Sequence, residues 1–211
     1  MQITILGASG QIGQAVVKEA LKSGYQIKVL VRSLAKLGDL KNGVTVIQGD
    51  LADSKALGEA LRGSEAVLNL AGGVKESDQA EKFKRIAGNL VEQMNQQGIK
   101  RLINISGAVT TPSGEKPELK RKIMKIMVGL FFKQMQQAQE AFMPVIEKTD
   151  FISWTFVRPA MISKGPVTGK IKTDDKKLPG TKVTLGDLSW FIVDQITSTE
   201  WIKKAPMIAS V

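Results

Sequence analysis

The stretch that decides the fold is Gln2-Ile3-Thr4-Ile5-Leu6-Gly7-Ala8-Ser9-Gly10-Gln11-Ile12-Gly13. A short β-branched apolar run ends at Gly7, and apolar residues at helical spacing follow Gly13. In such a strand–turn–helix unit Gly7 permits a sharp turn, Gly10 lets a pyrophosphate approach the backbone, and Gly13 lets the helix pack closely. The helix N-terminus presents free N–H groups to phosphates. The stretch predicts a dinucleotide-binding loop; an ordinary tight turn is the simpler alternative.

Short apolar runs alternate with helix-period segments along the rest of the chain. The runs that follow and are predicted as strands are 26–31, 44–48, 66–70, 101–105 and 152–157. The alternation favours an α/β fold with a doubly wound parallel sheet in the order 3-2-1-4-5-6. We expect a single domain over residues 1–211, with 163–182 as a loop or small C-terminal excursion on the substrate side and 207–209 as an extra edge strand.

The helices between these strands are predicted from caps and periodicity. Ser54 is expected to cap a helix that runs to about Leu61, and further helices are expected at 78–97, at 118–148 with breaks near Gly129 and Pro144, and from about Asp187.

Two residue types are missing from the 211 residues, and their absence narrows the chemistry. There is no cysteine and no histidine. This excludes disulfides, zinc–thiolate sites, iron–sulfur clusters, cysteine nucleophiles and the Ser-His-Asp triad, and we expect no metal. No targeting segment is recognised, and the longest apolar stretch, 126–132, is far shorter than the ~18 residues of a membrane span. We therefore expect a cytoplasmic protein without a membrane span.

The net charge of +10 is concentrated in two segments. Residues 116–133 hold six basic residues and one acidic residue, and residues 164–182 hold six basic and two acidic residues. These segments are either solvated faces or an electropositive rim around an anionic ligand. Because they follow the fifth and sixth strands, the second interpretation places them on the ligand side of the sheet.

Arg32 and Ser33 stand where the second strand ends. Proteins that bind NAD usually have an acidic residue there, which bonds the ribose 2′-hydroxyl. A carboxylate would repel a 2′-phosphate, whereas an arginine grips it in a bidentate manner. The position favours NADP(H) over NAD(H), with Lys36 as a helper. An unrelated surface arginine is the alternative.

Asp50 and Leu51 follow the third strand, where an adenine ring would lie. Asp50 can accept a hydrogen bond from the adenine amino group. A turn-forming aspartate explains the same residue almost as well.

Several of these motifs together resemble a known family. They are residues 7–13, Val-Arg-Ser at 31–33, Gly-Asp-Leu at 49–51, Asn-Leu-Ala-Gly-Gly at 69–73, Ile-Ser-Gly at 105–107 and Trp-Thr-Phe-Val-Arg-Pro-Ala at 154–160. The chain resembles the atypical short-chain dehydrogenase/reductases over almost its whole length, and within them the NAD(P)H-binding, NmrA-like and flavin-reductase-like branch. The resemblance implies a Rossmann fold and a bound dinucleotide.

The motifs and the resemblance together define a set of expected cofactor-binding residues. Gly72 and Gly73 are implied to flank the cofactor, and the nicotinamide pocket is implied to lie near Ser106 and Pro159. The full set is Gly7, Ala8, Ser9, Gly10, Gln11, Ile12, Gly13, Arg32, Ser33, Asp50, Leu51, Ala71, Gly72, Gly73, Ser106 and Pro159.

The chain departs from the family in the catalytic pair. Active members often carry Tyr-x-x-x-Lys on the helix after the fifth strand, with a Glu four residues beyond the Lys. If Glu140 is that Glu, Gln136 occupies the Lys position and Phe132 the Tyr position, and the only tyrosine is Tyr25. Phe132 cannot donate a proton, so carbonyl reduction by the phenol route is doubtful.

The function expected is hydride transfer from NADPH to a small-molecule acceptor: a flavin such as FMN, a quinone or a small carbonyl. Ser106 is the candidate catalytic residue, although a strand-end serine that caps a turn explains it equally well. Arg158 either approaches a phosphate or acceptor or forms a structural ion pair. An apolar set either lines an adaptable pocket or forms plain helix core: Met124, Met127, Phe131, Phe132 and Met161.

Two alternatives stay open beside the reductase. The first is a regulatory protein that senses NADP(H) without turnover, which the missing Tyr and Lys favour. The second, less supported, uses residues 116–133 as a basic amphipathic helix on a nucleic acid or an anionic membrane. We expect no nucleic-acid partner, and a monomer or homodimer.

Overall fold

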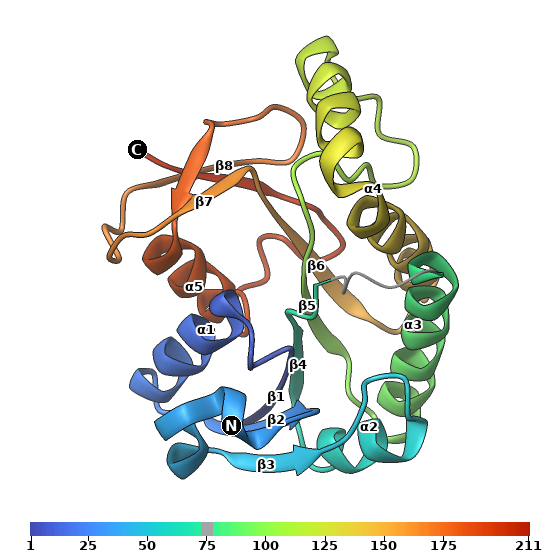
Figure 1. The fold of residues 1–211 in the computed structure, drawn as a ribbon, viewed down its shortest axis with the longest axis vertical. Helices are drawn as coiled ribbons and strands as arrows, with labels where there is room; N and C mark the ends of the chain where they lie inside the picture. Colours follow the sequence, from blue (N-terminus) through green and yellow to red (C-terminus); the bar gives the residue numbers. More distant parts are fainter. Residues whose placement is uncertain (73–77) are drawn as a thin grey trace.

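Six parallel strands form most of the main sheet in the computed structural model, which describes residues 1–72 and 78–211 (Figure 1). Their bounds are β1 Gln2–Leu6, β2 Gln26–Val31, β3 Thr45–Gln48, β4 Ala66–Asn69, β5 Arg101–Ile105 and β6 Ser153–Pro159. They pair in the order β3-β2-β1-β4-β5-β6, which confirms the predicted doubly wound sheet. The carboxyl ends of β1 and β4 therefore lie side by side.

Helices cover both faces of this sheet (Figure 1). On one face lie α1 Gln11–Lys22 and α5 Leu185–Asp194, which contact each other. On the other face lie α2 Ser54–Leu61, α3 Gln79–Gln96 and the second half of α4 Leu119–Glu147. A 3-10 segment, η1 Leu34–Gly43, follows β2 and was not expected from the sequence.

Neighbouring strand residues pack into opposite faces. Val67 joins the apolar cluster under α2 and α3, and Leu68 joins the cluster under α1 and α5. Leu102 and Ile103 of β5 divide in the same way. Both faces of the strands are thus buried, which explains their near-continuous apolar sequences.

The C-terminal part contains more structure than the sequence indicated. The expected loop at 163–182 includes β8 Ile171–Asp174 and reaches a small parallel sheet of β7 Met161–Ser163 and β9 Lys182–Thr184. The strand expected at the edge, β10 Met207–Ser210, instead lies between β6 and the antiparallel β8. The polar sequence of β8 hid it, because an edge strand does not need two apolar faces.

Three details expected of the helices were wrong: the cap of α2 and the two breaks in α4. Asp53, and not Ser54, caps α2, since its carboxylate accepts hydrogen bonds from the backbone N of Lys55 at 2.9 Å and of Ala56 at 3.3 Å. Helix α4 is irregular at Phe132, where φ is −131° and ψ is 33°, rather than at Gly129. It also continues through Pro144, where buried neighbours hold the turn in place.

Asp187 fastens the C-terminal part to α5. Its carboxylate is fully buried and accepts hydrogen bonds from Ser210 Oγ at 2.5 Å, Thr168 N at 2.6 Å and Gly169 N at 3.1 Å. Thr184 Oγ1 caps the helix by accepting from Asp187 N at 3.0 Å. Burial alone would raise the pKa of Asp187, but the hydrogen bonds from Ser210 and Thr168 outweigh it and hold the pKa below 3.8.

We expect Asp187→Asn to lower the free energy of unfolding by about 2 kcal/mol at neutral pH, because buried donors lose an anionic acceptor. The folded pKa is depressed, so this contribution is present above the unfolded pKa of about 3.9 and is lost as pH falls through the folded pKa. Urea denaturation of wild type and variant at about pH 7 and about pH 3 should show the difference shrinking in acid.

The matched control is Asp39→Asn, which removes an exposed carboxylate. It should leave the unfolding free energy nearly unchanged. An Asp187→Asn penalty that is as large in acid as at neutral pH would contradict the assignment.

Candidate functional site

The turn between β1 and α1 requires glycine at two of its three predicted positions. Gly7 has a φ of 79°, and a Cβ there would lie 2.6 Å from Ala71 N. A Cβ on Gly13 would lie 2.2 Å from Gly7 O and 2.7 Å from Ala8 Cα. Real side chains cannot approach backbone atoms so closely, so these two glycines let β1, α1 and the end of β4 pack together.

Gly10 differs from its two neighbours in the motif. A Cβ there would have only an ordinary contact, 3.5 Å from Gly7 O. Gly10 is also the N-cap of α1, and no side chain among the described residues caps the helix there. Packing against the described residues, 1–72 and 78–211, thus gives no reason for glycine at this position. What remains is the open space beside the positive end of the helix.

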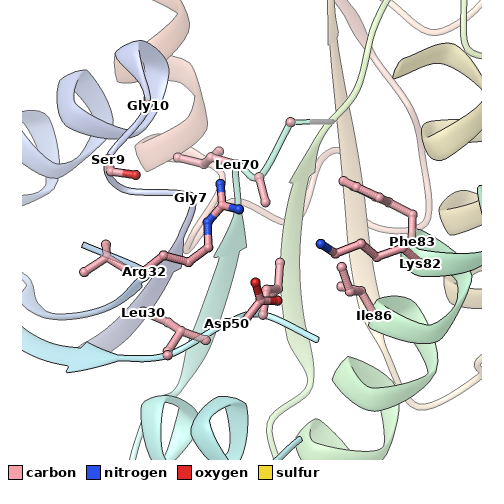
Figure 2. Close-up of a pocket in the computed structure, with 15 residues that line it drawn as sticks. Gly7, Ser9, Gly10, Leu30, Arg32, Asp50, Leu70, Lys82, Phe83 and Ile86 are labelled. Carbon is pink, nitrogen blue, oxygen red and sulfur yellow. The ribbon is translucent and has the colours of Figure 1, made fainter. Parts of the chain in front are cut away.

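That space is a cavity of about 220 Å³ at the carboxyl ends of β1–β4 (Figure 2). Eight residues expected from the sequence meet in its wall: Gly7, Ser9, Gly10, Arg32, Asp50, Leu51, Ala71 and Gly72. Ligands of open parallel sheets bind at such a crevice, where the strand order reverses.

Other expected residues do not line this cavity. Ala8 is buried in the core, and Ile12 packs against the apolar cluster under α1. The rest of this group are Gln11, Gly13, Ser33, Ser106 and Pro159. Gly73 lies outside the described residues.

Arg32 and Asp50 approach the cavity from neighbouring strand ends. In Figure 2 the guanidinium of Arg32 extends into the cavity. Asp50 Oδ1 accepts a hydrogen bond from Ala52 N at 2.8 Å, so the turn-forming role is present, and the residue also lines the cavity. Lys36, the expected helper, is exposed and is not part of the wall.

Three wall residues on α3 were missed by the sequence analysis: Lys82, Phe83 and Ile86. Figure 2 shows Lys82 pointing into the cavity from the side opposite Arg32. Phe83 and Ile86 follow the apolar period of the helix and gave no separate signal. Arg32 and Lys82 are the cations in the described wall. None of its described residues comes from the basic segments 116–133 or 164–182, so neither segment forms its rim.

The expected acceptor end begins at β5, the strand next to β4. Ser106 follows β5, its backbone N donates to Val157 O at 2.9 Å, and its Oγ is buried without a hydrogen-bond partner in the described structure. Close by, Asn69 Nδ2 donates to Asn104 Oδ1 at 2.6 Å and links the ends of β4 and β5. The hydroxyl of Ser106 is therefore a buried polar group to which none of the described residues offers a hydrogen bond.

Arg158 has a structural role and does not reach the cavity. Its fully buried guanidinium donates to Ala205 O at 2.7 Å, Thr110 O at 3.0 Å and Glu115 Oε2 at 2.7 Å. Burial lowers the pKa of Arg158 despite the opposing effect of Glu115. Of the two roles left open for Arg158, the structure shows the structural ion pair.

The residues that the sequence alignment set at the positions of the catalytic pair lie in the middle of α4. Phe132 is 57% exposed at the irregular turn of α4, and Gln136 Nε2 donates to Glu140 Oε1 at 3.2 Å. Tyr25 packs against the core cluster under α1. Four of the five apolar residues expected to form a pocket or helix core are instead exposed, namely Met127, Phe131, Phe132 and Met161, and Met124 is half-buried. Both expectations for this set were wrong.

The described residues form neither a cluster that could hold a metal ion nor a helix that could span a membrane. They contain no group of three or more acidic residues placed to hold a metal ion. None of the helices in 1–72 and 78–211 is long and apolar enough to cross a membrane.

Comparison with known proteins agrees with this geometry. The model of the NAD(P)H-binding family matches residues 7–199. The photosystem II assembly factor Ycf39 of Cyanophora paradoxa is 40% identical over 70 residues, which is 33% of this chain and 22% of that protein. The match thus spans only about a fifth of this curated relative's length.

Two solved structures share the fold at low sequence identity. The anaerobillin reductase ChuY from Escherichia coli O157:H7 superimposes with a TM-score of 0.83 at 15% identity, covering 100% of this chain and 97% of that one. A short-chain dehydrogenase/reductase from Veillonella parvula, in complex with NADP, gives 0.79 at 20% identity, covering 99% and 94%. With the glycine turn and the doubly wound sheet, the family match shows that the chain belongs to the NAD(P)H-binding family and has a Rossmann-type fold.

Proposed function

We propose that the protein is an NADP(H)-dependent oxidoreductase that passes a hydride from NADPH to a flavin, a quinone or a small carbonyl compound. The observation that carries this proposal is the side chain of Arg32, which enters the same cavity as the glycine turn. A carboxylate at this position would repel the 2′-phosphate that distinguishes NADP from NAD, whereas a guanidinium attracts it.

The residues of the cavity fit such a cofactor. Gly7, Ser9 and Gly10 would hold the pyrophosphate, because the space beside Gly10 adjoins the N-terminus of α1. Arg32 would bind the 2′-phosphate, and Asp50 with Leu51 would flank the adenine. Lys82 adds a second positive charge to the wall, which suits a ligand that carries several phosphate groups.

When bound, NADPH supplies the hydride, so the chain itself must position the reactants and manage protons. The Ser106 hydroxyl is free to bond the nicotinamide carboxamide or the acceptor oxygen. Since the only tyrosine, Tyr25, is half-buried against the apolar cluster under α1, no phenol can protonate a carbonyl product there. Flavins and quinones suit this site better, because solvent can protonate their reduced forms.

The lack of a phenol near the site also supports a second candidate, a protein that binds NADP(H) and regulates a partner without turnover. Phe132 and Gln136 replace the proton donor and its cationic partner, and Phe132 faces solvent. Cofactor binding is common to both candidates, so activity with an acceptor separates them.

We expect Arg32→Glu to weaken NADPH binding at least about tenfold while changing NADH binding much less, because the new carboxylate repels the 2′-phosphate. Nucleotide titration followed by tryptophan or NADPH fluorescence measures both constants. Arg62→Glu, which makes the same charge change outside the cavity wall, is the matched control and should bind like wild type. Equal losses for NADPH and NADH would contradict the role of Arg32.

We expect Gly13→Ala to lose stability and Gly10→Ala to lose affinity for NADPH. Gly13→Ala places a methyl group against Gly7 O and should lower the melting temperature. Gly10→Ala has room within the protein, so it should melt like wild type but bind NADPH about tenfold more weakly.

Gly88→Ala is the control for this pair, because Gly88 lies in α3 with open space around it. It should bind NADPH normally and be slightly more stable than wild type. Full affinity in Gly10→Ala would show that the space beside Gly10 does not receive the pyrophosphate.

We expect the purified protein to oxidise NADPH with FMN or a quinone, and Ser106→Ala to lower kcat about tenfold or more if its hydroxyl bonds the reacting groups. Absorbance at the NADPH band measures the rate for each acceptor, and nucleotide titration checks that Ser106→Ala still binds NADPH. Tight binding with no turnover on flavins, quinones or aldehydes would favour the sensing function.

A further inference from the structure

The first half of α4 exposes an unusual number of large apolar side chains. Within residues 119–135 the exposed ones, with their exposed fractions, are Leu119 72%, Ile123 51%, Ile126 68%, Met127 58%, Leu130 77%, Phe131 79%, Phe132 57% and Met135 43%. We call this surface the α4 crest. Large apolar side chains are normally exposed singly, whereas a continuous patch marks a surface that binds something.

The crest faces away from the protein because of how its residues are spaced along the helix. Leu119, Ile123, Ile126 and Leu130 are spaced by four, three and four residues, so they share one face. On the other side Arg121 is 2% exposed. An ordinary surface helix has the opposite arrangement, with its apolar stripe toward the core and its charges in water.

Arg121 fixes this orientation. Its Nε donates to Ala108 O at 3.0 Å, and its guanidinium pairs with Glu115, which also pairs with Arg158. Turning the crest inward would expose and break this buried network. Figure 1 shows the first half of α4 projecting beyond the sheet, whereas the part after Phe132 lies beside α3.

Positive charges border the crest. Lys120, Lys122 and Lys133 are exposed, and Lys125 pairs with Glu140 at 2.5 Å. No acidic residue occurs between Glu118 and Glu140. Helical geometry places Lys120 on one side of the apolar row and Lys122 on the other. The segment therefore presents an apolar ridge between cationic edges.

We propose that the α4 crest binds the surface of an anionic lipid bilayer, with its apolar side chains in the boundary between headgroups and acyl chains. A helix with Phe and Leu on one face and Lys beside it has the composition of interfacial helices. The anionic headgroups complement the bordering lysines. The helix lies on the bilayer and does not cross it, as no described helix is long and apolar enough to span one.

Other occupants fit the same surface less well. A second copy of the chain would bring the lysines of two crests together without acidic residues to pair them. A nucleic acid would meet the lysines but would leave the row of Leu119, Ile123, Ile126 and Leu130 in water. A lipid layer deforms around a projecting ridge and satisfies both the apolar and the cationic parts.

The test is flotation of the full-length protein with phosphatidylcholine vesicles, with and without phosphatidylglycerol. We expect wild type to float with the phosphatidylglycerol vesicles and to bind the neutral vesicles at least about tenfold more weakly. Leu130→Ser with Phe131→Ser, and separately Lys120→Glu with Lys122→Glu, should each reduce binding to anionic vesicles about tenfold or more. All four side chains are exposed, so neither double variant should change the melting temperature.

Matched controls change the same residue types elsewhere. Lys164→Glu with Lys170→Glu alters two exposed lysines outside α4, and Leu34→Ser with Val167→Ser removes two exposed apolar side chains. Both controls should float like wild type.

Three results would overturn the proposal. They are no flotation with anionic vesicles, equal flotation with neutral ones, and controls that lose binding as the α4 variants do. Gel filtration of the same samples can give a fourth. If the wild type does not bind vesicles but is a dimer, and if Leu130→Ser with Phe131→Ser dissociates that dimer, the crest binds a second copy of the chain.

Discussion

The close approach of three backbone segments at the glycine turn underlies the whole nucleotide end of the molecule. Gly13 lies against Gly7 O, and Gly7 lies against Ala71 N, so α1, β1 and the end of β4 meet without side chains between them. This contact places the N-terminus of α1 beside the strand ends. A larger residue at either position would push the helix off the sheet and separate the walls of the cavity.

The opposite end of the sheet depends on buried charges rather than on close backbone contacts. Glu115 pairs with both Arg121 and Arg158 and so ties the loop after β5 to α4 and to β6. Breaking one partner of such a network is costly, because the remaining charges stay buried. The network keeps the first half of α4 in one orientation. It thereby keeps the apolar crest apart from the cavity at the carboxyl ends of β1–β4.

The chain has a well-formed cavity at the switch point of the sheet, as suits a member of the NAD(P)H-binding family. The cavity has its glycines, Arg32 and Asp50 in one wall. Ser106, the catalytic candidate expected from the sequence, has a buried hydroxyl with no hydrogen-bond partner among the described residues. A site of this kind suits acceptors that take a hydride without a phenol beside them.

The sequence by itself determined the order of the six parallel strands and the glycine turn that begins the cavity, because glycine spacing and apolar periodicity are local patterns with few structural solutions. Only the tertiary structure decided which side chains from distant segments join them. Lys82 reaches the cavity because α3 packs over β4, and Arg158 is buried because Glu115 meets it across a loop. The orientation of α4 could not be predicted either, because it depends on residues that are distant in the sequence. An apolar stripe predicts that a helix has an apolar face, and only the pairing of Arg121 decides that this face points outward.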